Sequence, residues 1–201
     1  MNDLLNYLNI AVVIIFTIAY IPQIITTFKN KASIGVSSFF WFYVSVSTLV
    51  SLINLLETGE AAWYIYAGQF INTIIALCFS MWFNYKENKN KGGLLYLHPA
   101  LYALLMYMLV FWNIVNITQI FASIWIVIAY IFQIHHFIKV KSSEGVNPFL
   151  FILFAIGITL LTIIMYLTNV SLHIIITEII NVILLLTCFV LTIFYNKQNK
   201  L

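Results

Sequence analysis

Long apolar runs, separated by short polar segments, extend along the whole chain, and these runs contain no charged residue. A helix needs about 20 consecutive apolar residues to cross a bilayer, and the runs are of this length or longer. They cover residues 4–28, 32–56, 61–85, 92–138, 145–177 and 179–196. The pattern therefore predicts an integral membrane protein.

Two of the runs are too long for one span and contain polar breaks. Residues 92–138 break at Asn113 to Thr118, and residues 145–177 break at Thr168 and Asn169. None of the runs alternates polar and apolar residues with a period of two, so the expected fold class is all-α. We expect seven transmembrane helices, near residues 4–28, 38–56, 61–85, 94–115, 118–140, 149–168 and 172–195.

The composition excludes an ordinary soluble domain. Hydrophobic residues make up 63% of the 201 residues and charged residues only 7%, whereas a soluble domain is charged at about a quarter of its positions. Nine lysines diluted in such a chain cannot form the basic stripe that is typical of nucleic-acid binding. The lipid bilayer is therefore an expected partner, and nucleic acid is not.

The positions of the lysines predict the orientation of the chain. The residues that follow the first, third, fifth and seventh helices include all nine: Lys29, Lys31, Lys86, Lys89, Lys91, Lys139, Lys141, Lys197 and Lys200. The opposite side contains Asp3, Glu57 and Glu60 and no lysine. Because cytoplasmic loops accumulate lysine near the membrane, we expect a multi-pass protein of the cell membrane. Its N-terminus would lie outside and its C-terminus in the cytoplasm.

The chain contains an internal repeat at an offset of 110 residues. The segment AYIPQI from Ala19 aligns with AYIFQI from Ala129, and 11 of the 22 positions from Ala19 to Phe40 are identical without a gap. The matches include a glutamine, two lysines, a serine and a glycine, which chance similarity between apolar runs does not explain.

The repeat predicts three parts: a first three-helix repeat over residues 1–91, a linker helix over residues 92–116, and a second three-helix repeat over residues 117–201. An odd number of helices per repeat would insert the second copy upside down, and the single linker helix restores its orientation. We therefore expect a 3+1+3 arrangement of parallel bundles around a pseudo-two-fold axis along the membrane normal. Transporters place their substrates at such repeat interfaces.

The segment Tyr20-Ile-Pro22-Gln23, with the basic loop from Lys29 to Ser37 behind it, looks like the PQ-loop motif. With the 3+1+3 layout, the chain resembles the PQ-loop/SWEET transporter superfamily, which includes cystinosin-like amino-acid exporters, SWEET sugar transporters and half-sized SemiSWEETs. In the second copy, Phe132 stands where the family has proline. The resemblance implies a transporter that works by alternating access.

Pro22 removes a backbone hydrogen bond and is expected to kink the first helix near its cytoplasmic end. The resemblance implies that this kink is a hinge of the inner gate, and a static kink is the alternative. We expect Gln23 and Gln133 to hydrogen-bond the carbonyls that are freed at each bend, and to form the hinge of the inner gate together with Pro22.

Four polar residues are candidates for substrate binding. Gln69 and Asn72 lie on one helical face at a spacing of three, and Glu178 and Asn181 repeat this spacing at an offset of 109. By resemblance, Asn72 and Asn181 match the asparagine pair that binds substrate in SWEETs. Asparagine offers two donors and an acceptor to a polar solute. The alternative is that these amides hold helices together.

The register of the third helix against the seventh stays open at this point. An offset of 109 pairs polar residues with polar residues, and we prefer it for that reason. An offset of 110 would instead align Cys78 with Cys188.

Glu178 is the only acid that falls inside a predicted span rather than in a loop or terminus. A carboxyl group inside a bilayer is expensive and marks a functional site by default. It is a candidate proton carrier or a partner for a substrate ammonium group. The competing interpretation is a hydrated side chain near the outer surface.

Other polar and aromatic residues receive weaker assignments. A stripe of Ser45, Ser47, Ser51 and Asn54 is expected to line a cavity, with Thr159 and Thr162 as the comparable pair in the sixth helix. The aromatic residues at helix ends are expected at the membrane interface: Trp41, Tyr43, Trp63, Tyr64, Trp82, Tyr85 and Trp112. We expect no pocket tryptophan in the second or sixth helix.

The expected function is transport of a small polar solute, with a proton-coupled amino acid or amine-bearing metabolite preferred. A facilitative SWEET-like sugar transporter is the alternative, and a KDEL-receptor-like sorting receptor or a vitamin carrier is less favoured. Motifs of enzymes and ATP-driven pumps are absent from the sequence, so we expect neither catalysis nor a cofactor or metal. Protons and the solute are the expected partners, and a homo-oligomer is left open.

Overall fold

The computed structural model is all-helical across the residues that it describes. These are residues 2–29, 33–59, 62–91, 93, 96–112 and 115–198. Lys31, Glu60, Lys200 and residues 113 and 114 of the predicted polar break lie outside them.

Within these residues seven helices are present, which confirms the expected number and fold class. They are α1 (Asn2–Lys29), α2 (Ser38–Thr58), α3 (Trp63–Asn88), α4 (Leu97–Trp112), α5 (Val115–Val140), α6 (Pro148–Leu167) and α7 (Leu172–Gln198). Every bound lies within three residues of the predicted one. The position of charge-free runs is therefore sufficient to locate the helices.

Local sequence explains why α2 and α6 begin where they do. The Ser37 hydroxyl accepts a hydrogen bond from the backbone N–H of Phe40 at 3.3 Å, and the Asn147 side chain accepts one from Phe149 at 2.9 Å. Pro148 occupies the first turn of α6, where its missing N–H costs nothing. The two N-caps lie 110 residues apart, as the repeat requires.

Six of the described helices are long and apolar enough to cross a membrane. The exception is α4, of which 16 residues are helical. At about 1.5 Å per residue, this length is shorter than the hydrocarbon core that a full span crosses.

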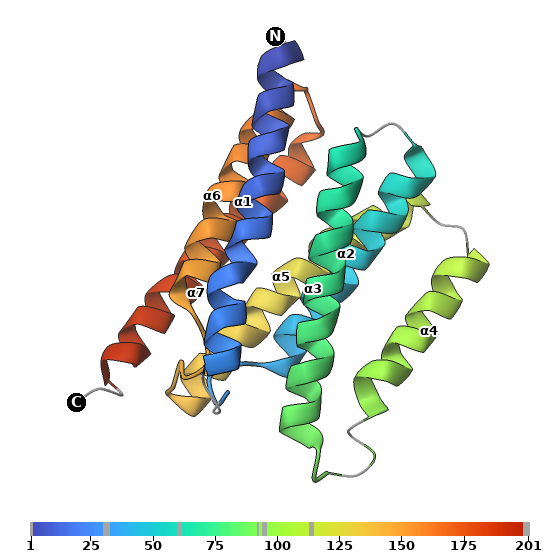
Figure 1. Ribbon diagram of the computed structural model, residues 1–201. Coiled ribbons are helices and arrows are strands. Elements are labelled where there is room, and N and C mark those ends of the chain that lie inside the picture. The colour runs from blue at the N-terminus through green and yellow to red at the C-terminus, as the bar shows by residue number, and fades with distance from the viewer. Residues whose placement is uncertain are drawn as a thin grey trace.

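The six long helices form a closed ring, and α4 packs outside it against α3 (Figure 1). Within the first half, α3 contacts both α1 and α2, and within the second half, α7 contacts both α5 and α6. The halves meet where α1 contacts α6 and where α2 contacts α5. Exchange of the two halves maps each of these contacts onto another, which is the pattern that a duplicated three-helix unit would produce.

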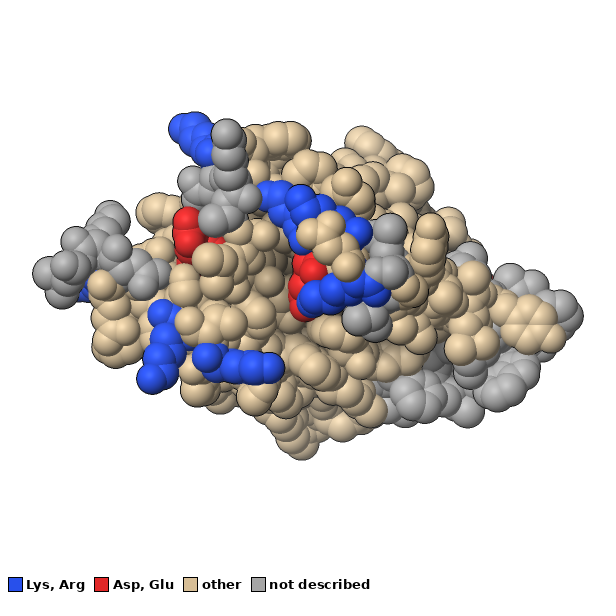
Figure 2. Space-filling view, turned by 90° about the horizontal axis from the view of Figure 1, so that it is seen from below, with Lys and Arg blue, Asp and Glu red and all other residues tan. Residues whose placement is uncertain are grey.

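The C-terminal ends of α1, α3, α5 and α7 lie at the lower end of the bundle in Figure 1. Figure 2 views this end and shows lysines spread across it, with acidic residues between them. The described lysines at or just beyond these helix ends are Lys29, Lys86, Lys89, Lys91, Lys139, Lys141 and Lys197. Their placement at one end is the arrangement from which the cytoplasmic orientation is predicted.

Candidate functional site

A cavity of about 540 Å³ lies inside the ring of six helices. Its lining extends from Trp41 and Phe151, near the lower starts of α2 and α6, to Leu55 and Met165, near the upper ends of the same helices. None of the residues that line it belongs to α4. A cavity of this size is typical for a small-molecule ligand.

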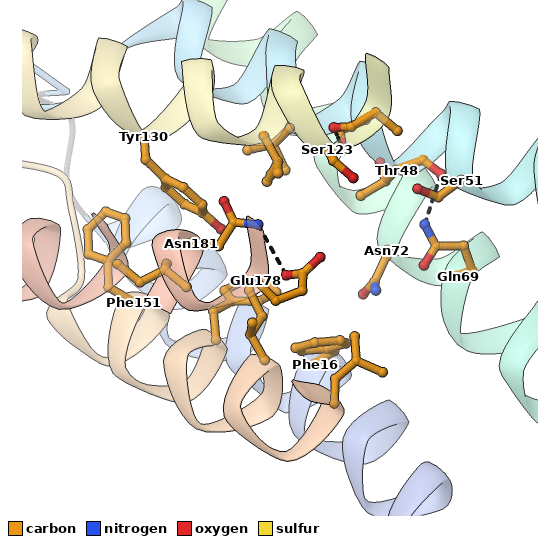
Figure 3. A pocket seen from close by; sticks show the side chains of 18 of the residues that line it. Phe16, Thr48, Ser51, Gln69, Asn72, Ser123, Tyr130, Phe151, Glu178 and Asn181 are labelled. Atoms are coloured by element: carbon orange, nitrogen blue, oxygen red, sulfur yellow. Dashed lines mark hydrogen bonds between the residues drawn. The ribbon is translucent and has the colours of Figure 1, made fainter. Parts of the chain in front are cut away.

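All four candidate binding residues line this cavity. Gln69 and Asn72 project from α3, and Glu178 and Asn181 project from α7 on the other side (Figure 3). Asn72 and Asn181 are buried, at 7% and 1% exposure. The structure therefore brings the four side chains into one space, although they belong to different halves of the chain.

The hydrogen bonds of these residues leave acceptor groups free for a ligand. Asn181 Nδ2 donates to Glu178 Oε2 at 3.1 Å, and Gln69 Nε2 donates to the backbone oxygen of Thr48 at 2.9 Å. In the described part of the chain, the buried Oδ1 atoms of Asn72 and Asn181 have no hydrogen-bond partner. A buried polar atom without a partner costs about 1–3 kcal/mol, so each of these oxygens is a candidate contact for a bound solute.

Burial decides the register of α3 against α7. Four buried residues of α3 lie 109 positions before buried residues of α7: Asn72 with Asn181, Ala76 with Leu185, Phe79 with Cys188, and Phe83 with Thr192. No buried residue of α3 lies 110 positions before a buried one of α7. Cys78 is exposed and Cys188 is buried, so the offset of 109 is the structural one.

The polar stripe of α2 divides between two environments. Ser47, Ser51 and Asn54 line the cavity as expected. Ser45 does not line it, because its hydroxyl faces α4 and bonds the hydroxyl of Tyr102. In α6, Thr159 and Thr162 are also not cavity residues: both hydroxyls donate to backbone oxygens one turn earlier in their own helix.

Trp41 corrects two of the expectations. It is 2% exposed and lines the cavity, so it is neither an interface anchor nor consistent with a pocket that lacks tryptophan in the second helix. Its ring packs against Phe79, with 4.4 Å between ring centroids. Helix-end position cannot separate a lipid-facing tryptophan from an inward-facing one, because both faces of a membrane helix are apolar.

The tyrosines of the internal repeat are cavity residues that the sequence reasoning missed. Tyr20 and Tyr130 lie 110 positions apart, both are buried, and both line the cavity. The Tyr20 hydroxyl has no partner among the described residues. Their repetition in AYIPQI and AYIFQI is the signal that could have identified them.

Gln23 and Gln133 do not bond the carbonyls freed at a helix bend, which corrects that expectation. Gln23 Nε2 donates to the backbone oxygen of Gly145 at 2.9 Å, and Gln23 Oε1 accepts from the backbone N–H of Asn147 at 2.9 Å. Gln133 Nε2 donates to the backbone oxygen of Gly35 at 2.7 Å, and its Oε1 accepts from the N–H of Ser37 at 3.2 Å. Each glutamine therefore binds the loop of the opposite half.

The two loops also contact each other directly below the cavity. The N–H of Gly35 donates to the backbone oxygen of Glu144 at 2.9 Å. A Cβ at position 35 would lie 2.5 Å from the carbonyl carbon of Ser143, so only glycine permits this approach. We call residues 33–37 and 143–147, with Gln23 and Gln133, the loop clasp.

Pro22 and two histidines lie near the loop clasp or beside α4. The helix α1 is continuous through Pro22. His136 Nε2 donates to the backbone oxygen of Ile34 at 2.8 Å, which places it next to the clasp. His98 is fully buried, and its Nδ1 lies 3.1 Å from the Ser80 hydroxyl. His98 therefore belongs to the packing of α4 and not to the cavity.

Comparison with known proteins finds one family model that matches part of the chain. Residues 4–62, which include most of α1, the first loop of the clasp and α2, match the family model of the PQ loop repeat. The searches of curated proteins and of solved structures found no match.

Proposed function

Because residues 4–62 match the PQ loop repeat and six helices are long and apolar enough to cross a membrane, we propose that this protein is a membrane transporter. It would carry a small polar solute through the central cavity. One observation carries the proposal: two buried amide oxygens and a carboxyl group face one cavity from helices of opposite halves. A purely structural role would give the two amide oxygens hydrogen-bond partners within the protein.

The chemistry of the cavity favours a solute with an amine. Asn72 and Asn181 offer free oxygen acceptors, and Glu178 adds a carboxyl group. An ammonium group carries three N–H donors and no acceptor, so three acceptors suit it. Rings such as Phe16 and Phe154 line the same cavity and can attract a cation through their faces. We therefore favour an amino acid or another amine-bearing metabolite.

Glu178 is the group that we propose for proton coupling. Its Oε2 accepts a hydrogen bond from Asn181. Protonation of the carboxyl group would weaken this bond and so change how Asn181, one turn away on α7, binds the solute. Binding of the proton or of the solute would then change the affinity for the other, which is the requirement for coupled transport.

Alternating access requires that the lower end of the cavity open, and the loop clasp is the structure that closes it. We propose that opening separates residues 33–37 from residues 143–147 and uses Pro22 as the hinge of α1. Pro22 lies inside α1 and has no backbone N–H to donate. The hydrogen bonding of the helix is therefore weakest at this residue.

A facilitative sugar transporter is the second candidate, and the position of Trp41 favours it. The indole ring lines the cavity and offers a flat apolar face on which the C–H groups of a sugar ring can pack. Asn72 and Asn181 would then accept hydrogen bonds from sugar hydroxyls instead of an ammonium group.

Uptake into proteoliposomes distinguishes these functions. Purified protein would be tested with labelled alanine, leucine, lysine and glucose, with and without an inward proton gradient. We expect amino-acid uptake that the gradient accelerates and that Glu178→Gln makes independent of the gradient. Glu57→Gln, which removes an exposed acid at the upper end of α2, is the matched control. Gradient-independent glucose uptake would support the sugar alternative, and uptake of none of these solutes would contradict transport of either class.

A further inference from the structure

We infer that Phe16 is a specificity-determining residue of the cavity and that Gly157 is the residue that positions it. The inference rests on the proposed function, because it requires the solute to occupy this cavity. The polar groups already described would bind the solute, and Phe16 on the α1 and α6 wall would limit its size.

Gly157 allows the ring of Phe16 to lie directly against the backbone of α6. A Cβ at position 157 would lie 2.4 Å from Cε1 and 2.7 Å from Cδ1 of Phe16. The ring also packs against Phe154, with 5.6 Å between centroids. The Phe16 ring can therefore pack this close to α6 only because residue 157 has no side chain.

The other side of the ring faces the cavity. Phe16 lines it, and Figure 3 shows the ring directed into the space that Glu178 and Asn72 also face. A displacement of the ring away from α6 therefore changes the room beside the two polar groups that we propose for solute binding.

The opposite half lacks this arrangement. At an offset of 110, Ile126 corresponds to Phe16 and Ser47 corresponds to Gly157. Ser47 donates its hydroxyl hydrogen to the backbone oxygen of Ala122 at 2.8 Å. At this one pair of equivalent positions, the cavity has an aromatic ring on the α1 and α6 wall and the aliphatic Ile126 on the α2 and α5 wall. This difference favours one orientation of an asymmetric solute, with Phe16 limiting the size of one end.

Gly68 provides a matched control in the same region of α1. A Cβ at position 68 would lie 2.6 Å from Cγ1 of Val13, so Gly68→Ala strains the packing of α1 to a similar degree. Val13 does not belong to the described cavity lining. The two glycine substitutions therefore separate an effect on packing from an effect on the cavity.

The test compares uptake of a larger and a smaller solute of the same class. Proteoliposomes would be supplied with labelled alanine and phenylalanine, and with glucose and sucrose. The measured quantity is the uptake rate of the larger solute divided by that of the smaller one. We expect Phe16→Ala to raise this ratio by about tenfold, Gly157→Ala to lower it, and Gly68→Ala to leave it unchanged. In the Phe16→Ala background, Gly157→Ala should have no further effect, because the displaced ring is gone.

Equal ratios in all variants, or equal effects of the two glycine substitutions, would overturn the inference while the proposed function stands. Absence of uptake of every solute by the wild-type protein would overturn both. If Gly157→Ala does not fold, the series Phe16→Leu and Phe16→Trp replaces it. The ratio must then rise with leucine and fall with tryptophan, and any other order overturns the inference.

Discussion

Asn72 and Asn181 face one cavity from α3 and α7, each with a buried side-chain oxygen that has no hydrogen-bond partner among the described residues. They lie 109 positions apart and occupy equivalent places in the two halves of the ring. An amide oxygen without an internal partner contributes little to folding, so its cost is explained if a solute supplies the missing donor.

We therefore predict that Asn72→Ala and Asn181→Ala lower uptake strongly. Loss of one hydrogen bond to a charged group reduces affinity by about tenfold or more, which a concentration series of proteoliposome uptake measures. For Asn72→Ala the melting temperature should change little, because the lost oxygen had no partner.

Asn88→Ala is the control for removal of a buried amide. Asn88 Nδ2 donates to Asn84 Oδ1 at 2.9 Å outside the cavity. Loss of this hydrogen bond should lower the free energy of unfolding by about 1 kcal/mol and leave the half-saturation concentration for uptake unchanged. A role for Asn72 only in helix packing predicts the reverse for that residue: lower stability with unchanged uptake.

A second prediction concerns the glutamines of the loop clasp. Gln23→Leu or Gln133→Leu removes two hydrogen bonds to the loop of the opposite half and leaves loop backbone groups without partners. This should favour the open lower end by about 2 kcal/mol. Hydrogen exchange in residues 33–37 and 143–147 should accelerate by about thirtyfold. Gln69→Leu, which removes a glutamine far from the clasp, should not change exchange in these segments, and unchanged exchange in all three variants would contradict the assigned role of the clasp.

A third prediction follows from the close approach of Gly35 to the second loop. Gly35→Ala places a Cβ against backbone atoms of Ser143, which cannot move aside as a flexible side chain would. We expect faster hydrogen exchange in both loops and a lower melting temperature. Gly93→Ala is the control, because a Cβ at position 93 would meet nothing within 4 Å. Equal melting temperatures for the two variants would show that the loops do not pack as described.

A fourth prediction tests Pro22 as a hinge. Pro22→Ala supplies the missing N–H to α1 and should stiffen it, because an interior proline costs a helix about 3 kcal/mol. We expect a higher melting temperature, a lower maximal uptake rate and an unchanged half-saturation concentration. Pro99→Ala, in the first turn of α4 where N–H groups lack helical partners, should leave the uptake rate unchanged. A maximal rate that survives Pro22→Ala would favour the static kink.

Much of this organisation follows from sequence patterns, for physical reasons that differ between features. Helix bounds follow from charge, because a charged group inside hydrocarbon is expensive and is excluded from spans. The cavity positions of Asn72 and Asn181 follow from the same principle applied to amides. Their pairing across the ring required only the repeat, since equivalent residues of a duplicated unit face a common axis.

Other contacts depend on tertiary packing and could not be read from local pattern. Trp41 faces inward and Phe149 is 61% exposed, although both lie near the start of a helix, because lipid and protein interior are equally apolar. The partners of Gln23 and Gln133 lie about a hundred residues away in sequence, so a local expectation placed them wrongly. The approach of Gly157 to Phe16 depends on how closely α1 and α6 pack.

The crossed hydrogen bonds of the loop clasp have a consequence for leakage. Gln23 in the first half holds the second loop, Gln133 in the second half holds the first loop, and Gly35 joins the loops to each other. Neither half can release its own end without breaking bonds that belong to the other. If the lower end opens as proposed, a partly opened passage through which ions could pass without the solute would leave some of these backbone groups without partners. We therefore expect the two loops to separate together.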